Sequence, residues 1–263
     1  MRTATINGEL WGAKAEPWSQ IQEGQVLPLY HAAFDAAGVT AGTGLLDAGC
    51  GSGLALELAV KRGAIGSGLD ASAALLEIAR HRVPDAELRV GELEELPYAD
   101  DTFDVATAFN SVQYAGDPKC ALSELARVVR PGGLVAVATW GQPQDCQITA
   151  VLGEVMPLMP PPPPGAAHEG PFALSEPGRL ESFVAAAGLQ PVVTREVACP
   201  MVYPDPDTAV HGQASSGVVV TAVRHAGERA VDDALRRSLA QFTEADGSVR
   251  IPNTFRFIVA EVG

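Results

Sequence analysis

The sequence Leu45-Leu46-Asp47-Ala48-Gly49-Cys50-Gly51-Ser52-Gly53 joins a predicted strand to a predicted helix. The apolar pair before Asp47 is too short for a free-standing helix and predicts the end of a buried strand. Glycine at every second position permits backbone conformations that other residues avoid, and it lets a ligand approach the main chain. A helical pattern follows from Ser52 to Arg62, so its free N–H groups and positive dipole end lie at the same turn. The segment therefore predicts a ligand-binding turn at the carboxyl end of a strand.

The alternation of strand and helix continues along the chain. Strands are predicted at 64–69, 86–90, 103–109 and 134–139, and helices at 72–82 and 118–130. This order predicts right-handed βαβ units and a doubly wound α/β sheet with helices on both faces. Ligands of such sheets bind at the carboxyl ends of the strands, near the point where the strand order reverses.

The residues of the glycine turn favour one class of ligand over two others. A dinucleotide-binding loop of the form G-x-G-x-x-G would have its third glycine at position 54, where the chain has Leu54. A P-loop would continue into Gly-Lys-Ser or Gly-Lys-Thr, which does not follow here. The carboxylate of Asp47 would repel a phosphate and favour an ammonium group. The turn therefore predicts a ligand with an amino-acid moiety, and an NAD-linked oxidoreductase is the less favoured alternative.

The next two strands also end in acids. Gly68-Leu69-Asp70 places a carboxylate where it can accept hydrogen bonds from both hydroxyls of a ribose. Gly91-Glu92-Leu93 ends the third strand, where a carboxylate and the neighbouring backbone could meet an adenine. The predicted site thus lies across three neighbouring strand ends.

Together these segments resemble the core of the class I S-adenosylmethionine-dependent methyltransferases, in particular the ubiquinone/menaquinone-type small-molecule group. The resemblance covers residues 43–140 and rests on LLDAGCGSG, GLDAS, GELEELPYADDTFDVA and VVRPGGLVAVATW. It implies S-adenosylmethionine as the cofactor and methyl transfer to an O, N or C atom of an apolar small molecule. It also implies a Rossmann-like seven-stranded sheet, mostly parallel with the last strand antiparallel, and a helical substrate cap. The alternative is a non-methylating family member that binds the cofactor or another ligand, for example a cyclase.

For the methionine end of the cofactor, the resemblance implies contacts from the glycine turn. Asp47 and the backbone of Gly49, Gly51 and Gly53 would hold this part. A helix at the N-terminus often covers the cofactor in this fold, which would bring Trp18 to the site.

For the nucleoside end, the resemblance implies contacts from the next two strand ends. Asp70 would bind the ribose hydroxyls, with Ala71 against the adenine. Gly91, Glu92 and Leu93 would also face the adenine. The family more often has Asp at the position of Glu92, so this contact is expected to differ in detail.

Few residues qualify as catalytic groups. If the acceptor atom carries a proton, a base must lie within hydrogen-bond reach of it. His31, on the predicted N-terminal helix, is the first candidate, followed by Gln113 and Tyr114. The resemblance places Asn110 and Ser111 near the sulfonium and the methyl group. No spacing of His, Asp or Glu resembles a metal site.

The flanks of the core are predicted to be mostly helical. A helix at 19–38, broken or kinked at Pro28, belongs to an N-terminal lid. The prolines Pro160–Pro164 predict a stiff surface loop. The expected division of the chain is a lid at 1–40, the cofactor core at 41–140, a substrate cap at 141–248 with the sixth strand near 191–198, and the final core strand at 249–263.

Composition narrows the possible partners and the expected location of the protein. Among 263 residues, Lys+Arg 18 and Asp+Glu 32 give a net charge of −14, which argues against nucleic acid as a partner. No apolar run is long enough to span a membrane, and the N-terminus lacks the apolar stretch of a secretory signal. The four cysteines are far apart and form no C-x-x-C pair, which predicts reduced thiols and a cytoplasmic protein. No feature indicates an oligomeric state.

Overall fold

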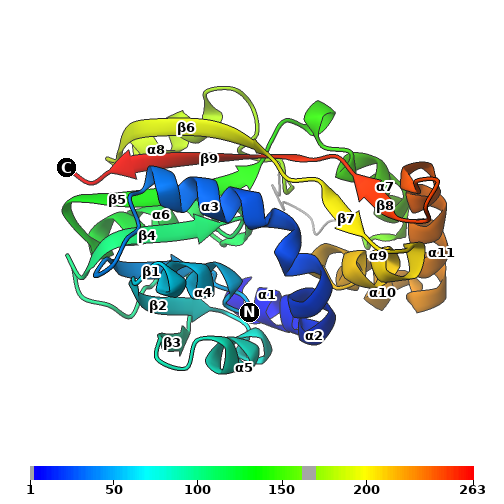
Figure 1. Ribbon diagram of the computed structural model, residues 1–263, viewed down its shortest axis with the longest axis horizontal. Coiled ribbons are helices and arrows are strands. Elements are labelled where there is room, and N and C mark those ends of the chain that lie inside the picture. The colour runs from blue at the N-terminus through cyan, green and yellow to red at the C-terminus, as the bar shows by residue number, and fades with distance from the viewer. Residues whose placement is uncertain (1–2, 162–169) are drawn as a thin grey trace.

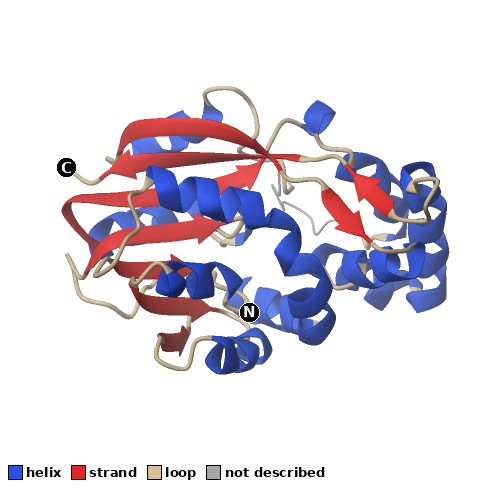
Figure 2. Ribbon diagram, in the orientation of Figure 1, coloured by secondary structure: helices blue, strands red, loops and turns tan. Residues whose placement is uncertain are grey.

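A seven-stranded sheet forms the centre of the protein, in the strand order β3-β2-β1-β4-β5-β9-β6 (Figures 1 and 2). The computed structural model describes residues 3–161 and 170–263. The strands of this sheet are β1 (Gly44–Ala48), β2 (Ile65–Asp70), β3 (Glu87–Val90), β4 (Phe103–Phe109), β5 (Val129–Trp140), β6 (Gln190–Ala198) and β9 (Thr254–Glu261). Strands β1 to β5 pair in parallel, whereas β9 is antiparallel to both of its neighbours. The predicted Rossmann-like sheet with an antiparallel last strand is confirmed.

Helices cover both faces of the sheet because successive side chains of each strand point to opposite faces. Leu45 and Phe257 pack into one core with α3 (Leu27–Ala36) and α4 (Leu54–Lys61). Leu46 and Ile258 pack into the other core with α6 (Pro118–Val128) and α8 (Arg179–Ala186). In Figure 1, α3 lies across the front of the sheet. Helix α5 (Ala73–Arg82) packs beside β3 at the sheet edge.

Most predicted helix boundaries agree with the structure to within a few residues. Ser72 is the N-cap of α5, as the sequence predicts, and its hydroxyl accepts a hydrogen bond from the N–H of Leu75 at 3.3 Å. The predicted helix at 118–130 is too long, because β5 already begins at Val129. The register of β5 against β4 shifts between Phe103 and Val105, so an irregularity accommodates the Pro-Gly-Gly segment inside the strand.

The N-terminal segment differs from the single kinked helix predicted at 19–38. It contains α1 (Thr3–Gly12), α2 (Ala15–Pro17), a π-helical turn at Trp18–Gln22 and a 3₁₀ turn at Glu23–Val26 before α3 begins. Pro28 does not break a helix here but lies in the first turn of α3. A proline is tolerated there because the first N–H groups of a helix have no partner within the helix.

The segment predicted as a cap forms the right side of Figure 1 and returns one strand to the sheet. Its helices are α7 (Ile148–Val155), α9 (Pro206–Gln213), α10 (Gly217–Ala226) and α11 (Glu228–Leu239), and a two-stranded ribbon pairs β7 (Met201–Tyr203) with β8 (Val249–Ile251). Short 3₁₀ turns lie at Val112–Tyr114, Pro143–Asp145, Met156–Leu158 and Ala240–Phe242. The predicted sixth strand is present as β6. Of the proline run, residues 162–164 lie outside the described residues.

In the part of the chain that the structure describes, no helix combines the length and the apolar character needed to cross a membrane.

Candidate active site

One cavity lies at the carboxyl ends of the parallel strands, where β1 is flanked by β2 and β4 on its two sides. This is the point where the strand order reverses, as the fold predicts. The N-terminal helices and the cap helices contribute the remaining walls, so residues from Ala4 to Phe255 line a single space. The strand ends form one end of the cavity, which we call the cofactor end. The cap forms the other, which we call the acceptor end.

The glycine turn after β1 is shaped by close contacts that exclude side chains. Gly49 has φ +82°, and a Cβ built on it would lie 2.4 Å from Cβ of Ser111. The N–H groups of Gly49 and Cys50 donate to the carbonyl of Leu69 at 2.7 and 3.0 Å, which joins the turn to β2. Only glycine fits the first position of this turn.

Asp70 fixes the turn from the end of β2. Its Oδ2 accepts a hydrogen bond from the N–H of Gly51 at 2.9 Å, and its Oδ1 accepts one from the N–H of Ser72 at 2.7 Å. Burial raises the pKa of the carboxyl group above its usual value, and these backbone hydrogen bonds oppose the rise. Asp70 therefore connects the glycine turn to the start of α5 while it lines the cavity.

Asp47 lies at the floor of the cofactor end and is only 2% exposed. Its Oδ1 accepts a hydrogen bond from the hydroxyl of Thr107 at 2.8 Å. Its Oδ2 receives no hydrogen bond from residues 3–161 or 170–263. Burial raises the pKa of Asp47 to about 7. The hydrogen bond from Thr107 lowers the pKa, and the negative charges of Glu23 and Asp70 raise it further. A cation bound here would be stabilised by an ionised Asp47.

Glu23 is a third buried carboxylate, and no sequence pattern predicts it. Its Oε2 accepts hydrogen bonds from the hydroxyl of Ser52 at 2.6 Å and from Arg82 at 2.5 Å. Its Oε1 lies 3.4 Å from the Cβ position of Gly51, so the group reaches the glycine turn. Burial raises its pKa despite these partners. Glu23 connects the N-terminal segment to the turn.

Aromatic side chains from the N-terminal segment cover the same end. The rings of Trp11 and Trp18 meet edge to face, with 4.8 Å between their centroids, and Trp11 meets Tyr114 in the same way at 5.6 Å. Gly8 lets α1 approach closely, since a Cβ there would lie 2.3 Å from the carbonyl oxygen of Ala71. Trp18, predicted at the site, lines the cavity.

Eleven of the twelve residues predicted to contact the cofactor line this cavity: Trp18, Asp47, Gly49, Gly51, Asp70, Ala71, Gly91, Glu92, Leu93, Asn110 and Ser111. Asn110 has φ +53°, a backbone conformation that residues other than glycine rarely adopt and that is found at functional sites. The exception is Gly53, which caps α4 with φ +82°. A Cβ on Gly53 would lie 2.9 Å from Cβ of Ala79, so this glycine serves the packing of α4 against α5.

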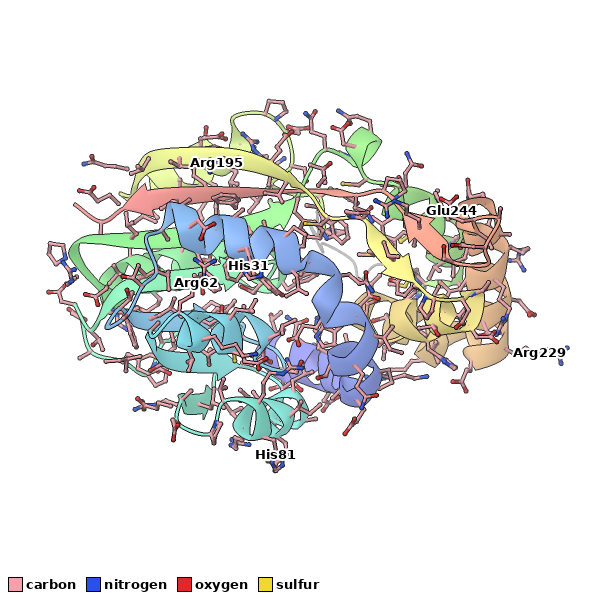
Figure 3. All side chains as sticks on the ribbon, viewed as in Figure 1. His31, Arg62, His81, Arg195, Arg229 and Glu244 are labelled. Carbon is pink, nitrogen blue, oxygen red and sulfur yellow. The ribbon has the colours of Figure 1, made fainter. Side chains whose placement is uncertain are left out.

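The two residues predicted as catalytic, His31 and Gln113, are not among the described residues that line the cavity. His31 is exposed, and its Nδ1 lies 3.3 Å from the guanidinium of Arg62 on the outside of the molecule (Figure 3). The next face of α3 carries Tyr30 into the cavity instead. Gln113 is buried behind the wall, where its Nε2 donates to Oδ1 of Asn110. Gln113 therefore positions Asn110 and does not reach a ligand in the cavity.

The acceptor end is apolar and aromatic. The rings of Tyr30 and Phe109 pack at a tilt of 54° with 5.0 Å between their centroids, and those of Trp140 and Phe255 pack at a tilt of 32° with 4.3 Å between theirs. The remaining walls come from the cap and the N-terminal segment: Val26, Leu29, Ile148, Leu152, Pro171, Met201 and Val218. Two buried amides, Gln22 and Gln213, interrupt this surface. No sequence pattern predicts either residue, because they come from helical segments far apart in the chain.

Comparison with known proteins separates the two ends in the same way. A family profile described as "Methyltransferase domain" matches residues 46–137, which contain the cofactor end. Residues 46–137 are therefore similar to this methyltransferase domain family. The resemblance to class I S-adenosylmethionine-dependent methyltransferases is thereby confirmed for this methyltransferase domain.

Curated relatives match part of the chain. A demethylmenaquinone methyltransferase of Renibacterium salmoninarum is 35% identical over 109 residues, which are 41% of this chain and 46% of that protein. A malonyl-acyl-carrier-protein O-methyltransferase of Salmonella typhimurium is 42% identical over 95 residues, 36% of this chain and 38% of that protein. The chain spans less than half the length of these relatives.

Among solved structures, the cyclase SpnF superimposes with a TM-score of 0.57 at 18% identity. The superposition covers 89% of this chain and 80% of that chain. At this identity the likeness shows the fold alone, and the fold extends well beyond the methyltransferase domain.

Proposed function

We propose that the protein transfers the methyl group of S-adenosylmethionine to an O, N or C atom of an apolar small molecule. The observation that carries the proposal is the cofactor end itself. A carboxylate oxygen of Asp47 that receives no hydrogen bond from residues 3–161 or 170–263 lines the same cavity as a glycine turn that a side chain would fill. These groups fit the methionine part of the cofactor, whose ammonium and sulfonium are both positive. When bound, the cofactor supplies an electrophilic methyl group with a neutral thioether as leaving group.

The buried acids have complementary tasks in this proposal. Glu23 and Asp47 surround the methionine part with negative charge, and Asp70 faces the ribose. Glu92 and the neighbouring Leu93 line the wall proposed for the adenine. Trp11, Trp18 and Tyr114 exclude water from the same end, which strengthens these electrostatic contacts.

Alignment of the two substrates is the main catalytic contribution of the chain. Methyl transfer disperses a charge that is already present, so correct positioning of the attacking atom supplies much of the rate. Tyr30 is the ionisable group at the acceptor end, and burial, with the charges of Glu23 and Asp47, raises its pKa well above the usual value. Its hydroxyl therefore stays protonated at neutral pH and acts as a hydrogen-bond donor and not as a base.

Calorimetry and methyl transfer test the proposal in two steps. Titration of the full chain with S-adenosylhomocysteine should show binding, whereas NADH should not bind; the reverse result would exclude the proposed cofactor. Transfer of a radiolabelled methyl group from S-adenosylmethionine to a panel of lipophilic phenols, amines and enols then tests the reaction. Cofactor binding without transfer to any of them would favour the non-methylating alternative. The expected cytoplasmic location stays a prediction.

A further inference from the structure

We propose that Gln213 selects and orients the acceptor by accepting a hydrogen bond from a hydroxyl or N–H group of an otherwise apolar, uncharged molecule. The inference rests on the proposed function, since it concerns the second substrate of the same cavity. It requires that the acceptor carry a hydrogen-bond donor, which the apolar walls alone do not require.

The starting observation is a buried polar cluster beside the acceptor end. The hydroxyl of Tyr203 donates to Oε1 of Gln22 at 2.8 Å and accepts from Nε2 of Gln213 at 2.8 Å. Tyr203 is 1% exposed, Gln213 3% and Gln22 7%. Both glutamines line the cavity, so the cluster connects its wall to the protein interior.

The thioether of Met201 determines which way both amides point. Nε2 of Gln213 lies 3.3 Å from the sulfur, and Nε2 of Gln22 lies 3.6 Å from it. A thioether sulfur accepts hydrogen bonds weakly and never donates them, so the amide nitrogens face it. The single hydroxyl proton of Tyr203 is then directed to Gln22 and is not available to Gln213.

This arrangement provides no donor for one hydrogen-bond acceptor of the cluster, Oε1 of Gln213. Within the described ranges, 3–161 and 170–263, no N–H or O–H group donates to Oε1 of Gln213. This oxygen lies at the cavity wall, where a donor group of a ligand can pair with it. A hydroxyl or N–H group satisfies this atom, whereas an ether, a ketone or a hydrocarbon does not.

The backbone holds the cluster in place. A Cβ on Gly212 would lie 2.9 Å from Oε1 of Gln22, so α9 approaches the π-helical turn as closely as glycine allows. Asp205 caps the start of α9 by accepting a hydrogen bond from the N–H of Thr208 at 2.7 Å. Gln213 is therefore presented by a fixed element, which suits it to orient a ligand.

The remaining walls define the rest of the acceptor. The aromatic side chains Tyr30, Phe109, Trp140 and Phe255 favour a flat apolar body. The acids of the cofactor end, Glu23, Asp47, Asp70, Glu92 and Glu94, line the same cavity and disfavour an anionic acceptor. The structure thus fits a neutral, ring-containing molecule that carries a hydrogen-bond donor.

Two probes that differ only in the donor test the inference. Equilibrium dialysis measures binding of 2-naphthol and of 2-methoxynaphthalene to the full chain saturated with S-adenosylhomocysteine. We expect 2-naphthol to bind about fivefold more tightly, the value of one neutral hydrogen bond. In Gln213→Leu, and in Gln213→Met should the first variant not fold, the ratio should fall to about one.

Gln25→Leu is the matched control. Gln25 is an amide near the same turn, but its Oε1 and Nε2 are paired with the backbone of Val202 at 2.8 and 3.0 Å, and it does not line the cavity. This variant should keep the wild-type ratio.

The outcomes separate the inference from the proposed function. Equal binding of the two probes, no binding of either, or a preference that persists without Gln213 overturns the inference while leaving cofactor binding intact. Failure of S-adenosylhomocysteine to bind overturns the proposed function instead, and a donor preference that depends on Gln213 would then still support a hydroxyl-binding site.

Discussion

The two ends of the cavity are built in different ways. The cofactor end consists largely of main chain and carboxylates from short segments at the ends of consecutive strands, including 47–51, 70–71 and 91–93, and Trp11, Trp18 and Glu23 of the N-terminal segment complete it. The acceptor end consists of side chains whose positions in the sequence range from Gln22 to Phe255. One end depends on backbone conformation and charge, and the other on packing.

This difference predicts different tolerance to change. At the cofactor end the backbone and the carboxylates must hold fixed positions. A single added methyl group or lost charge should therefore abolish cofactor binding or weaken it strongly. At the acceptor end, a substitution should change which molecule binds while the cofactor still binds. Measurements of S-adenosylhomocysteine affinity therefore report on the first end, and probe affinity reports on the second.

The largest effect is expected from Gly49→Ala. The added Cβ would lie 2.4 Å from Cβ of Ser111, in a backbone conformation with φ +82°. We expect the affinity for S-adenosylhomocysteine, measured by calorimetry, to fall about 100-fold, from the strain of the left-handed conformation together with the clash. Gly38→Ala is the control, since Gly38 also has positive φ but nothing lies within 4 Å of its Cβ position. Equal affinity losses in both variants would contradict the close approach at Ser111.

Asp70→Asn should have the next largest effect. Both oxygens of Asp70 accept backbone hydrogen bonds, from Gly51 and Ser72, and an amide has one acceptor oxygen only. Its NH₂ group would face an N–H group, so we expect about a tenfold loss of S-adenosylhomocysteine affinity.

Asp104→Asn is a control for the loss of a backbone-bound carboxylate. Asp104 accepts a hydrogen bond from the N–H of Gly44 at 2.7 Å and pairs with Arg130 at 2.6 Å, but it does not line the cavity. This variant should lose stability and keep cofactor affinity. A comparable loss of affinity would mean that Asp70 acts through general stability and not through the turn.

The contrast between the two ends also explains how much of the site can be predicted from the sequence. The cofactor end is encoded locally, because each strand is followed at once by the residues that the ligand meets, and β-strand position fixes where those residues lie. Eleven of twelve predicted contacts therefore line the cavity. Gly53 differs because its spacing matches the motif while its contact is with Ala79 of the next helix.

The acceptor end could not be predicted because no local pattern encodes it. Gln22, Tyr203 and Gln213 meet only after α9 packs against the π-helical turn. The π-helical turn changes which side chains of the N-terminal segment face inward, and regular helical periodicity does not anticipate it. Glu23 directly follows this turn and lines the cavity.

The third prediction concerns pH and separates charge from shape at the cofactor end. Burial raises the pKa of Asp47 to about 7, so the folded protein holds this proton more tightly than the unfolded chain. The free energy of unfolding of the ligand-free protein should therefore fall as the pH rises from about 4 to about 7. The ammonium group of the ligand prefers the ionised carboxylate, so its affinity should change in the opposite direction.

We expect the affinity for S-adenosylhomocysteine to rise about fivefold between pH 6 and pH 7.5, a range in which the ligand's α-amino group stays mostly protonated. Calorimetry across this range measures the slope. In Asp47→Asn the dependence of affinity on pH should weaken sharply. Thr107→Val, which removes the hydrogen bond to Asp47, should shift the rise in affinity to higher pH. A slope that is unchanged in Asp47→Asn would assign the titration to Glu23 or Asp70 instead.

The smallest effect is expected from His31→Ala, and its value lies in the comparison with the preceding residue. His31 and Tyr30 are neighbours on α3, but they lie on different faces of the helix, His31 beside Arg62 and Asp35 on the surface and Tyr30 in the cavity. Removal of the exposed imidazole should change the free energy of unfolding by less than about 0.5 kcal/mol and leave methyl transfer unaltered. Tyr30→Phe removes a hydroxyl from a residue that lines the cavity, so it should weaken 2-naphthol binding or slow methyl transfer while S-adenosylhomocysteine affinity is kept. A loss of methyl transfer in His31→Ala with normal cofactor affinity would require α3 to turn its outer face inward during the reaction, and it would reverse the roles that the structure gives to these two side chains.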